Sequence, residues 1–363
     1  MARRLVFDRW LFSVPLALTL FGLLMVYSAS SAISRQDYQN PYHFLLRQSV
    51  AAGIGLVIMF LTMFFPYRAY RSRWFSGALV LGITGLLVLV FLRPPIQDVH
   101  RWLDLGFFNL QPSEMAKIVL VIALAGWLDR PRVEIRNWKS TLLPCLVLIG
   151  QTSLLVMLEP DLGTCAILML TSLLVLYMGG IPLRQMAVVG LVATAALTVF
   201  IFSADYRVQR VVTFFNPDAD LQGSGFQSNQ SLLAVSSGGL SGRNLGEGQQ
   251  KQFFLPEPHT DFIYAVVAEE TGFIGSVAVL FGFAVILWRG LRASARAPDR
   301  FGAVLGIGLT LGLGVSALIN MGVVLALLPT KGLPLPFVSY GGSSLLCSLA
   351  SIGILLNLSQ HSS

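Results

Sequence analysis

Long apolar runs, separated by short charged or proline-containing breaks, make up most of the chain. Ten of these runs are predicted to be membrane-spanning helices: 11–30, 48–65, 74–92, 115–128, 141–158, 163–179, 186–202, 262–288, 301–327 and 340–357. Most are long enough to cross a hydrocarbon layer of about 30 Å at roughly 1.5 Å per helical residue, although 115–128 is short. The pattern predicts an all-α polytopic membrane protein with one integral domain over residues 1–363.

Composition supports this fold class. Of the 363 residues, 55% are hydrophobic and only 12% are charged, and the mean hydropathy is +0.71. Soluble domains are about one quarter charged. A soluble enzyme, a disordered chain and a disulfide-stapled secreted domain are therefore excluded. Cys145, Cys165 and Cys347 lie in apolar runs without metal-ligand spacing and are interpreted as small core residues.

Lys and Arg are divided unequally between the two sets of connections. The N-terminal segment and the connections on its side of the membrane contain fifteen basic and four acidic residues, whereas the other side has ten and fourteen. The positive-inside rule therefore predicts that both termini are cytoplasmic. The first run has no convincing cleavage site and is expected to remain as a span. These arginine clusters explain the net charge of +7, so no nucleic-acid partner is expected.

The outer connections contain most residues of chemical interest, notably in 93–117 and 203–261. The 203–261 loop is too long for a passive connection, and loops of this length are usually functional or disordered. Its apolar segments, such as 231–235, argue against disorder. The function is therefore predicted to reside on the outer face.

The stretch 255–263, Leu-Pro-Glu-Pro-His-Thr-Asp-Phe-Ile, ends this loop and begins the eighth predicted span. One interpretation of Asp261 is a helix N-cap or first-turn acid, which is a common role. Glu257, His259 and the pair Glu269–Glu270 crowd the same region. The pair falls inside an apolar span, where ionised groups are costly and normally face a cavity. A cap does not explain this cluster, so a chemical role stays open beside it.

Two other acidic motifs allow two interpretations each. Glu114 and Lys117 in Gln-Pro-Ser-Glu-Met-Ala-Lys lie three residues apart on one helical face, where they form either a surface ion pair or a site for an anionic head group. Glu159 and Asp161 in Glu-Pro-Asp-Leu-Gly-Thr belong either to a plain turn or to a site for a divalent cation, with oxygen ligands.

Two loops are rich in glycine or proline. Residues 328–344 are apolar enough to enter the bilayer but contain too much Pro and Gly for a continuous helix, which predicts a re-entrant loop. Residues 238–248 resemble a phosphate-binding loop in composition only. They lack the strand–loop–helix frame and the lysine of that motif, so a nucleotide site is rejected.

Basic side chains also gather on the outer side: Arg47, Arg93, Arg101, Lys117, Arg207, Arg210, Arg243, Lys251 and Lys331. A cavity lined by bases, with acids at its centre, suits a lipid-linked phosphate or pyrophosphate. No external nucleotide is available on that face to drive a reaction. The substrate is therefore expected to bring an activated bond, as a glycosyl pyrophosphate does.

The motifs resemble those of the SEDS family, named for shape, elongation, division and sporulation. The matching segments, in family order, are Tyr-Ser-Ala-Ser at 27–30, His-Arg-Trp-Leu at 100–103, 111–117, 159–164, 225–240, 255–275 and 335–346. The 328–336 and 250–263 segments are more similar to the cell-division members than to the elongation members. One departure is Asn244, where the family usually has a small or glycine-like residue.

The resemblance implies a ten-span enzyme that polymerises lipid II into glycan strands at the division septum, in the cytoplasmic membrane of a bacterium. It also implies as partners a class B penicillin-binding protein, which is a transpeptidase, and other membrane proteins of the division machinery. The essential aspartate of the family falls on Asp261, and its other outer-cavity residues fall on Arg47, Glu114, Lys117 and Asp161.

Chemical reasoning agrees with this role. Asp261 is the predicted general base, because a desolvated, acid-rich setting raises a carboxyl pKa toward the working range. Arg47, Lys117 and Arg210 are predicted to hold the pyrophosphate, and His259 and Lys331 complete the predicted substrate-binding set. A Mg²⁺ or Mn²⁺ ion is compatible with the same task, but no ligand set is decisive.

Three alternatives remain at this stage. The first is a flippase for the lipid-linked precursor, which needs polar groups along a path to both faces. The second is a polymerase for elongation rather than division. The third is a scaffold for division proteins, which would tolerate replacement of Asp261 by Asn.

Overall fold

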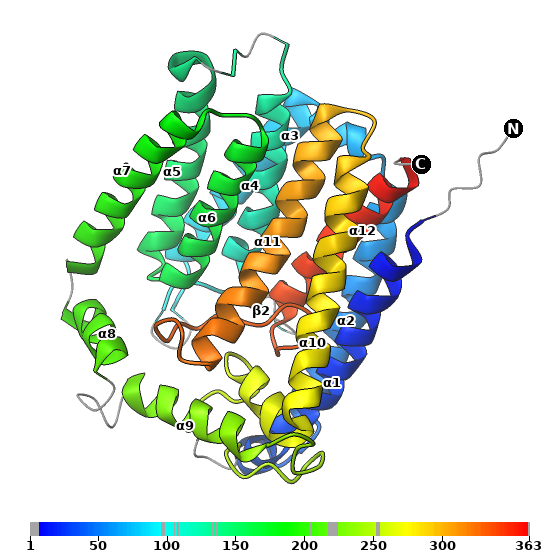
Figure 1. Ribbon diagram of the computed structural model, residues 1–363, viewed down its shortest axis with the longest axis vertical. Helices are drawn as coiled ribbons and strands as arrows, with labels where there is room; N and C mark the ends of the chain where they lie inside the picture. Colours follow the sequence, from blue (N-terminus) through cyan, green and yellow to red (C-terminus); the bar gives the residue numbers. More distant parts are fainter. Residues whose placement is uncertain are drawn as a thin grey trace, which may run out of the picture.

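The computed structural model describes residues 7–95, 99–104, 106, 109–131, 134–135, 137–202, 205–216, 224–251 and 255–361. Ten helices in this part of the chain run along the long axis of one bundle (Figure 1). They are α1 (Arg9–Tyr38), α2 (His43–Phe64), α3 (Arg73–Phe91), α4 (Pro112–Leu128), α5 (Leu143–Leu158), α6 (Leu162–Met178), α7 (Leu183–Phe202), α10 (Ile263–Ala295), α11 (Arg300–Val324) and α12 (Gly342–His361).

The shorter elements lie between these helices. They are the turns η1 (Tyr67–Arg71) and η2 (Trp138–Leu142), the outer helices α8 (Asp205–Phe215) and α9 (Ser224–Ser237), and a two-stranded hairpin. The hairpin pairs β1 (Leu103–Asp104) with β2 (Asn109–Leu110). Seven bundle helices are long and apolar enough to cross a membrane, and so is α5 when it is counted together with η2. The remaining two, α4 and α6, are shorter, with 17 residues each. The predicted all-α polytopic membrane fold is confirmed.

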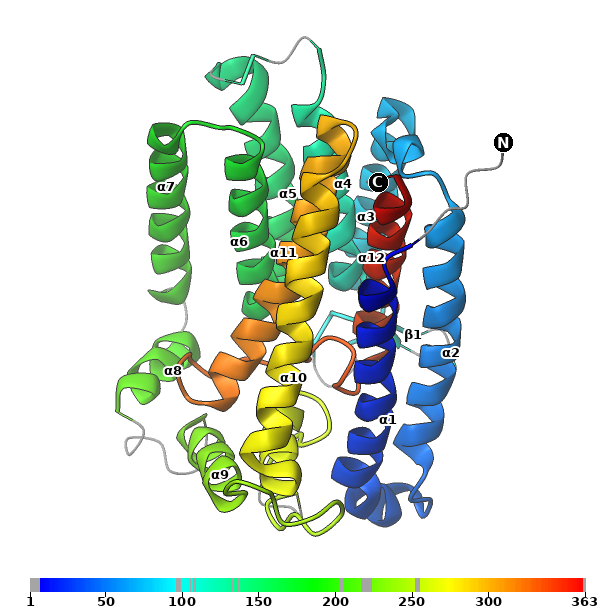
Figure 2. The ribbon, with the colours of Figure 1, turned by 45° about the vertical axis from the view of Figure 1, so that its right-hand side comes forward.

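The start of α1 and the end of α12 lie at one end of the bundle, and α8 and α9 lie at the other (Figures 1 and 2). The arginine-rich connections belong to the end with the termini, where two ion pairs join segments distant in sequence. The Arg289 guanidinium contacts Asp8, which also caps α1 by accepting from the Trp10 and Leu11 amides. Arg68 lies 3.3 Å from Asp299, the N-cap of α11. Ion pairs therefore join connections that are distant in sequence, outside the apolar layer.

Helix α12 lies in the interior of the bundle, and most of its residues are buried. It packs along α2, and Gly353 makes this approach possible, because a Cβ there would lie 2.3 Å from the Met59 carbonyl oxygen. The helix also brings several serines into the interior, among them Ser344, Ser348 and Ser351. A central helix with small and hydroxyl side chains leaves space for a polar cavity beside it.

The eighth predicted span is wrong in its first third. Gly272 has φ 67° and ψ −164°, which divides α10 into segments 263–271 and 273–295. The Tyr264 hydroxyl donates to the Ser276 carbonyl oxygen, although a straight helix would separate residues twelve apart by about 18 Å. The chain therefore reverses at Gly272, and only the second segment runs the length of the bundle. A left-handed glycine permits this corner, and hydropathy does not reveal it.

Residues 325–341, between α11 and α12, form no helix and fold into the bundle. Leu335, Phe337 and Val338 are each no more than 2% exposed. The segment packs on α1 at Gly22, where a Cβ would lie 2.5 Å from the Phe337 carbonyl oxygen. Irregular backbone of this kind is stable at membrane depth when protein covers it. The re-entrant interpretation of 328–344 stays a prediction.

Glu269 and Glu270, which were expected to face a cavity, are enclosed by protein in the described part of the chain. Both are buried by the outer loop, whose backbone amides donate to them: Gln249 to Glu269 at 2.7 Å and Gly246 to Glu270 at 3.1 Å. Lys251 places its ammonium 2.5 Å from Glu270. The glycine-rich segment 238–248, which resembles a phosphate loop in composition, is thus part of a cradle for the protein's own carboxylates. The Glu269–Glu270 pair anchors the loop that leads to Asp261.

Candidate active site

A cavity of about 240 Å³ lies in the half of the bundle nearer to α8 and α9. Several segments line it: residues 99–102, the start of α4 with Gln111 before it, the start of α6, the loop before α10, and the loop before α12 together with its first turn. The lining residues are Val99, Arg101, Trp102, Gln111, Glu114, Asp161, Thr164, Glu257, Thr260, Asp261, Gly332, Pro334, Tyr340, Gly341 and Ser344. Asp261, Glu114 and Asp161, which belong to three distant motifs, thus meet at one site.

Asp261 presents its carboxylate to this cavity. The N-cap residue of α10 is Phe262, with no side-chain cap, and within the described residues the Asp261 carboxylate accepts no hydrogen bond. Its backbone is held instead, because the Asn320 amide nitrogen donates to the Asp261 carbonyl oxygen at 2.9 Å. Gly332 lies against the carboxylate, and a Cβ there would be 2.9 Å from Oδ2. The geometry disfavours a helix cap and leaves the carboxylate available to a ligand.

Burial, together with the negative charges of Glu257 and Asp161, raises the pKa of Asp261 to about 7. Arg101 acts in the opposite direction but does not cancel these effects. A carboxyl with a pKa near neutrality is a stronger base than an ordinary aspartate and is still partly ionised at the working pH. Asp261 therefore has the proton affinity that a general base requires.

Asp161 has a structural role that Asp261 lacks. It caps α6, with Oδ1 accepting from the Thr164 amide at 3.0 Å and Oδ2 accepting from the Thr164 hydroxyl and the Gln111 amide. The Arg101 guanidinium fixes the same turn by donating to the Glu159 carbonyl oxygen at 2.9 Å. Asp161 thus shapes the cavity and keeps a negative charge near Asp261.

Glu159 is fully buried beside this turn, and burial together with Asp161 raises its pKa to about 8. Its two carboxylate oxygens accept no hydrogen bond from described residues. Asp161, the other acid of the turn, has both oxygens engaged by the protein. No group of three or more His, Cys, Asp or Glu side chains with metal-binding geometry occurs in the described part of the chain. These described residues therefore supply no evident ligand set for the Mg²⁺ or Mn²⁺ ion that the sequence left open.

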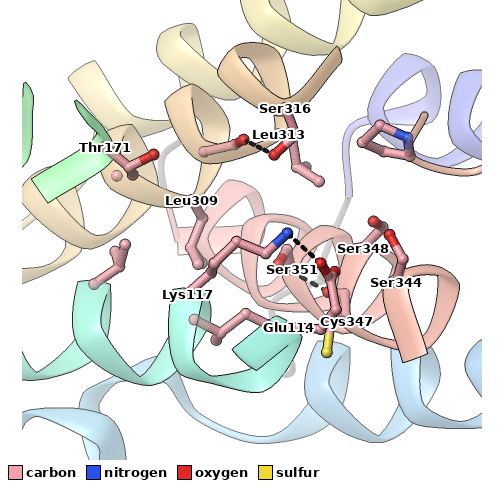
Figure 3. Close-up of a pocket in the computed structure, with 15 residues that line it drawn as sticks. Glu114, Lys117, Thr171, Leu309, Leu313, Ser316, Ser344, Cys347, Ser348 and Ser351 are labelled. Atoms are coloured by element: carbon pink, nitrogen blue, oxygen red, sulfur yellow. Dashed lines mark hydrogen bonds and ion pairs between the residues drawn. The ribbon is translucent and has the colours of Figure 1, made fainter. Parts of the chain in front are cut away.

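A second, smaller cavity of about 40 Å³ adjoins the first, and Glu114 and Ser344 line both. In Figure 3, Lys117 of α4 points toward Glu114, and Ser344, Ser348 and Ser351 of α12 lie nearby. The Lys117 ammonium lies 2.8 Å from Glu114 Oε1, and the two side chains are only 19% and 3% exposed. The ion pair is therefore not a simple surface pair, because Glu114 is buried and Lys117 is partly buried.

Of the other predicted binding residues, Arg47 and Lys331 adjoin residues that line the cavity. Arg47 is exposed on α2, and its guanidinium interacts with the hydroxyl of Tyr340, which lines the cavity wall. Lys331 is half-buried and directly precedes the lining residue Gly332. Arg210 belongs to α8, but its side chain lies outside the described residues.

His259 does not line the cavity. Its ring packs 4.4 Å from Phe44 and 5.5 Å from Tyr340, measured between ring centroids, and is 6% exposed. Burial lowers its pKa, and Glu257, whose carboxylate lies 4.0 Å from Nε2, only partly offsets this effect. The structure therefore places His259 as a neutral packing residue behind the Asp261 loop, away from the predicted substrate position.

Comparison with known proteins identifies the family. The family model described as a cell cycle protein, which covers FtsW, RodA and SpoVE, matches residues 8–363. The chain belongs to this family, the SEDS family.

Individual SEDS relatives extend over nearly the whole chain. Stage V sporulation protein E of Bacillus subtilis is 38% identical over 359 residues, covering 98% of this chain and 97% of the relative. The probable peptidoglycan glycosyltransferase FtsW of Geobacter sulfurreducens is 40% identical over 359 residues, covering 98% and 95%.

Two solved structures share the fold. A chain from a peptidoglycan synthase complex has a TM-score of 0.79 and 30% identity, with 98% of both chains covered. The rod shape determining protein RodA of Thermus thermophilus has a TM-score of 0.72 and 29% identity, covering 98% of this chain and 97% of its own.

Three polar residues that support the SEDS site were not predicted from the sequence. Gln48 donates to the Ser339 carbonyl oxygen and accepts from the Gly341 amide, and the Ser339 hydroxyl donates to the Thr260 carbonyl oxygen at 2.6 Å. Asn320 bridges the carbonyl oxygens of Asp261 and Leu333. The sequence signal that could have found them is an amide or hydroxyl side chain within or beside an apolar run. Such a polar group is expected to be buried, and buried polar groups normally have a hydrogen-bond partner.

Replacing Asn320 by Ala or by Leu is expected to lower kcat about 10- to 100-fold with little change in KM, because the Asp261 carbonyl loses its donor and the base moves by a fraction of an ångström. Polymerisation kinetics of both variants test this positioning role. Leu restores most of the volume without a donor, so it should resemble Ala. Thr310→Val on the same helix removes a hydroxyl that bonds only its own helix and is the control. Activity of Asn320→Leu equal to that of the native chain would contradict the prediction.

Proposed function

We propose that this peptidoglycan glycosyltransferase polymerises lipid II into glycan strands on the outer face of the cytoplasmic membrane, with Asp261 as its general base. The observation that carries this proposal is the uncapped Asp261 carboxylate, which faces a cavity and has a pKa of about 7. Lys117, paired with Glu114, supplies a partly buried cation in the smaller cavity that shares Glu114 and Ser344 with it. A base and a cation in two adjoining cavities match the charges that develop during glycosyl transfer to a hydroxyl.

The proposed reaction is a single displacement. Asp261 takes the proton of an acceptor sugar hydroxyl, and the resulting oxygen attacks the anomeric carbon of the donor. The bond from that carbon to the pyrophosphate oxygen breaks, and undecaprenyl pyrophosphate leaves with the bonding electron pair. Lys117 and Arg47 stabilise the negative charge that develops on this oxygen. One base suffices because inversion at the anomeric carbon involves no covalent sugar intermediate.

The proposed cellular role is septal wall synthesis during cell division. The curated relatives include proteins named FtsW, and the sequence strings at 250–263 and 328–336 favour that branch over elongation. A structural relative belongs to a peptidoglycan synthase complex, which supports assembly of this chain with a class B penicillin-binding protein. Complementation of strains depleted of their division or elongation polymerase separates the two roles, and rescue of elongation alone would overturn the septal assignment.

Purified lipid II provides the direct test of the activity. The native chain is incubated with it alone and with the cognate penicillin-binding protein whose transpeptidase site is blocked, and glycan length is measured. Long strands are expected from the complex. Absence of strands, together with lipid II scrambling in vesicles that contain the folded complex, would overturn the proposal in favour of a flippase.

A further inference from the structure

A second large cavity lies at the opposite end of the bundle, on the side of the termini. Its volume is about 650 Å³, and Gly126 and Pro131 complete its wall. The polar and aromatic lining comes from the η1–α3 junction, the end of α4 and the turn η2: Arg71, Arg73, Trp127, Asp129, Arg130 and Ser140. No residue of this cavity lines either cavity at the Asp261 end, so the proposed reaction does not explain it.

The charges of this cavity are not balanced. Arg71 pairs with Asp129 at 2.6 Å, whereas Arg73 and Arg130 form no ion pair with any described residue. The Arg130 guanidinium stacks on Trp127, 3.9 Å from the ring centroid. Burial lowers the pKa of Arg130, and the positive charge of Arg73 lowers it further. Two close cations without a counter-charge create a site that favours an anion.

The start of a helix adds positive potential at the same place. Helix α3 starts at Arg73 with neither a side-chain cap nor an acidic residue in its first turn, so its positive end is also uncompensated. Guanidinium groups and a helix start together supply the donors that phosphate oxygens accept.

Exposed aromatic and apolar side chains around this cavity indicate where its ligand comes from. Trp74 is 79% exposed, Trp138 is 43% exposed and Leu143 is 55% exposed. Tryptophan gathers where a membrane meets water, and exposed leucine on a spanning helix faces lipid. The cavity therefore opens at the level of lipid head groups, and the positive-inside prediction makes this the cytoplasmic leaflet.

We propose that the Arg71–Arg73–Arg130 cavity binds the phosphate group of an anionic phospholipid from the cytoplasmic leaflet. Arg73 and Arg130 neutralise the phosphate, and the acyl chains lie along the exposed faces of α3 and α5. Basic pockets between spanning helices at this face are suited to such head groups.

Native mass spectrometry of the full chain tests the site, with phosphatidylglycerol or cardiolipin compared with phosphatidylcholine. The double variant Arg73→Gln/Arg130→Gln should bind the anionic lipid roughly 30-fold more weakly, because about 1 kcal/mol per arginine converts at about 1.4 kcal/mol per tenfold. The control Arg184→Gln/Arg292→Gln removes two exposed arginines from the same end, outside the cavity. Retained polymerisation by the double variant reports that it is folded.

The outcomes are distinct. A selective loss in the Arg73/Arg130 double variant supports the site, and an equal loss in the control would reduce the effect to general surface charge and overturn it. If the native chain retained phosphatidylcholine as well as the anionic lipids, lipid binding would be non-specific and the proposed site would be overturned. Protection of the native chain against heat by inorganic phosphate, with no adduct from anionic lipid, would overturn the lipid as the source of the phosphate.

Discussion

Replacing Asp261 by Asn is expected to lower lipid II polymerisation about 10²- to 10⁴-fold, the range typical of a lost general base. Asn keeps the shape of the side chain but does not take up a proton at neutral pH. The carboxylate accepts no hydrogen bond from described residues, so the substitution removes no cap or ion pair from the fold. Strand synthesis by the purified complex, native and variant, measures the effect. Equal product from both would remove Asp261 from the mechanism.

The pH dependence follows from the same group. Activity should rise with pH through a midpoint near 7, because Asp261 must be ionised to act and burial raises its pKa to about 7. The folded state therefore binds this proton more tightly than the unfolded chain, in which the pKa is near 3.8. Stability consequently falls as pH rises between these values. Asp261→Asn removes this loss of stability. At pH 8 the melting temperature of the variant should therefore be no lower than that of the native chain.

Glu257→Gln provides the matched control for this profile. Glu257 lies near Asp261 and raises its pKa by charge repulsion. Its neutral replacement should move the acid limb of the activity profile to lower pH, whereas a base elsewhere in the protein would leave the midpoint unchanged.

Helix positions were predictable because an apolar layer demands long apolar runs, and each of the ten bundle helices overlaps a predicted span, although the eighth begins its run along the bundle only after Gly272. The corner at Gly272 was not predictable, because the segments on both sides are apolar and helical. One residue with a positive φ reverses the chain and places the Asp261 loop inside the bundle. Glycine alone does not signal this, since the chain contains 34 of them.

The site shows a similar division. Sequence spacing identified Asp261, Asp161 and Glu114 as candidates but could not separate a cap from a free carboxylate, because both follow a turn and precede a helix. Contacts made the distinction: Asp161 accepts three hydrogen bonds from Thr164 and Gln111. His259 was chosen because it is near Asp261 in sequence. Its ring nevertheless packs against Phe44, and this contact between segments far apart in sequence has no local signature.

Removing the charge of Lys117 alone is expected to harm both stability and activity. Lys117→Met leaves Glu114 buried without its partner, which costs about 3 kcal/mol or more for a pair of this kind. Thermal or detergent unfolding of the purified chain measures this loss. Activity falls too, but the single variant does not separate a missing phosphate ligand from a damaged fold.

The double variant Glu114→Gln/Lys117→Met makes that separation. Replacing both charges leaves no uncompensated ion, so stability should return to within about 1 kcal/mol of native. Polymerisation should nevertheless remain about 10²- to 10³-fold below native, since Arg47 is then the only one of the two proposed cations left to stabilise the leaving pyrophosphate. Recovery of stability and activity together would show that the pair only maintains the cavity. Recovery of stability alone assigns Lys117 to the substrate, because a neutral pair can rebuild the packing around α4 but cannot stabilise a developing negative charge.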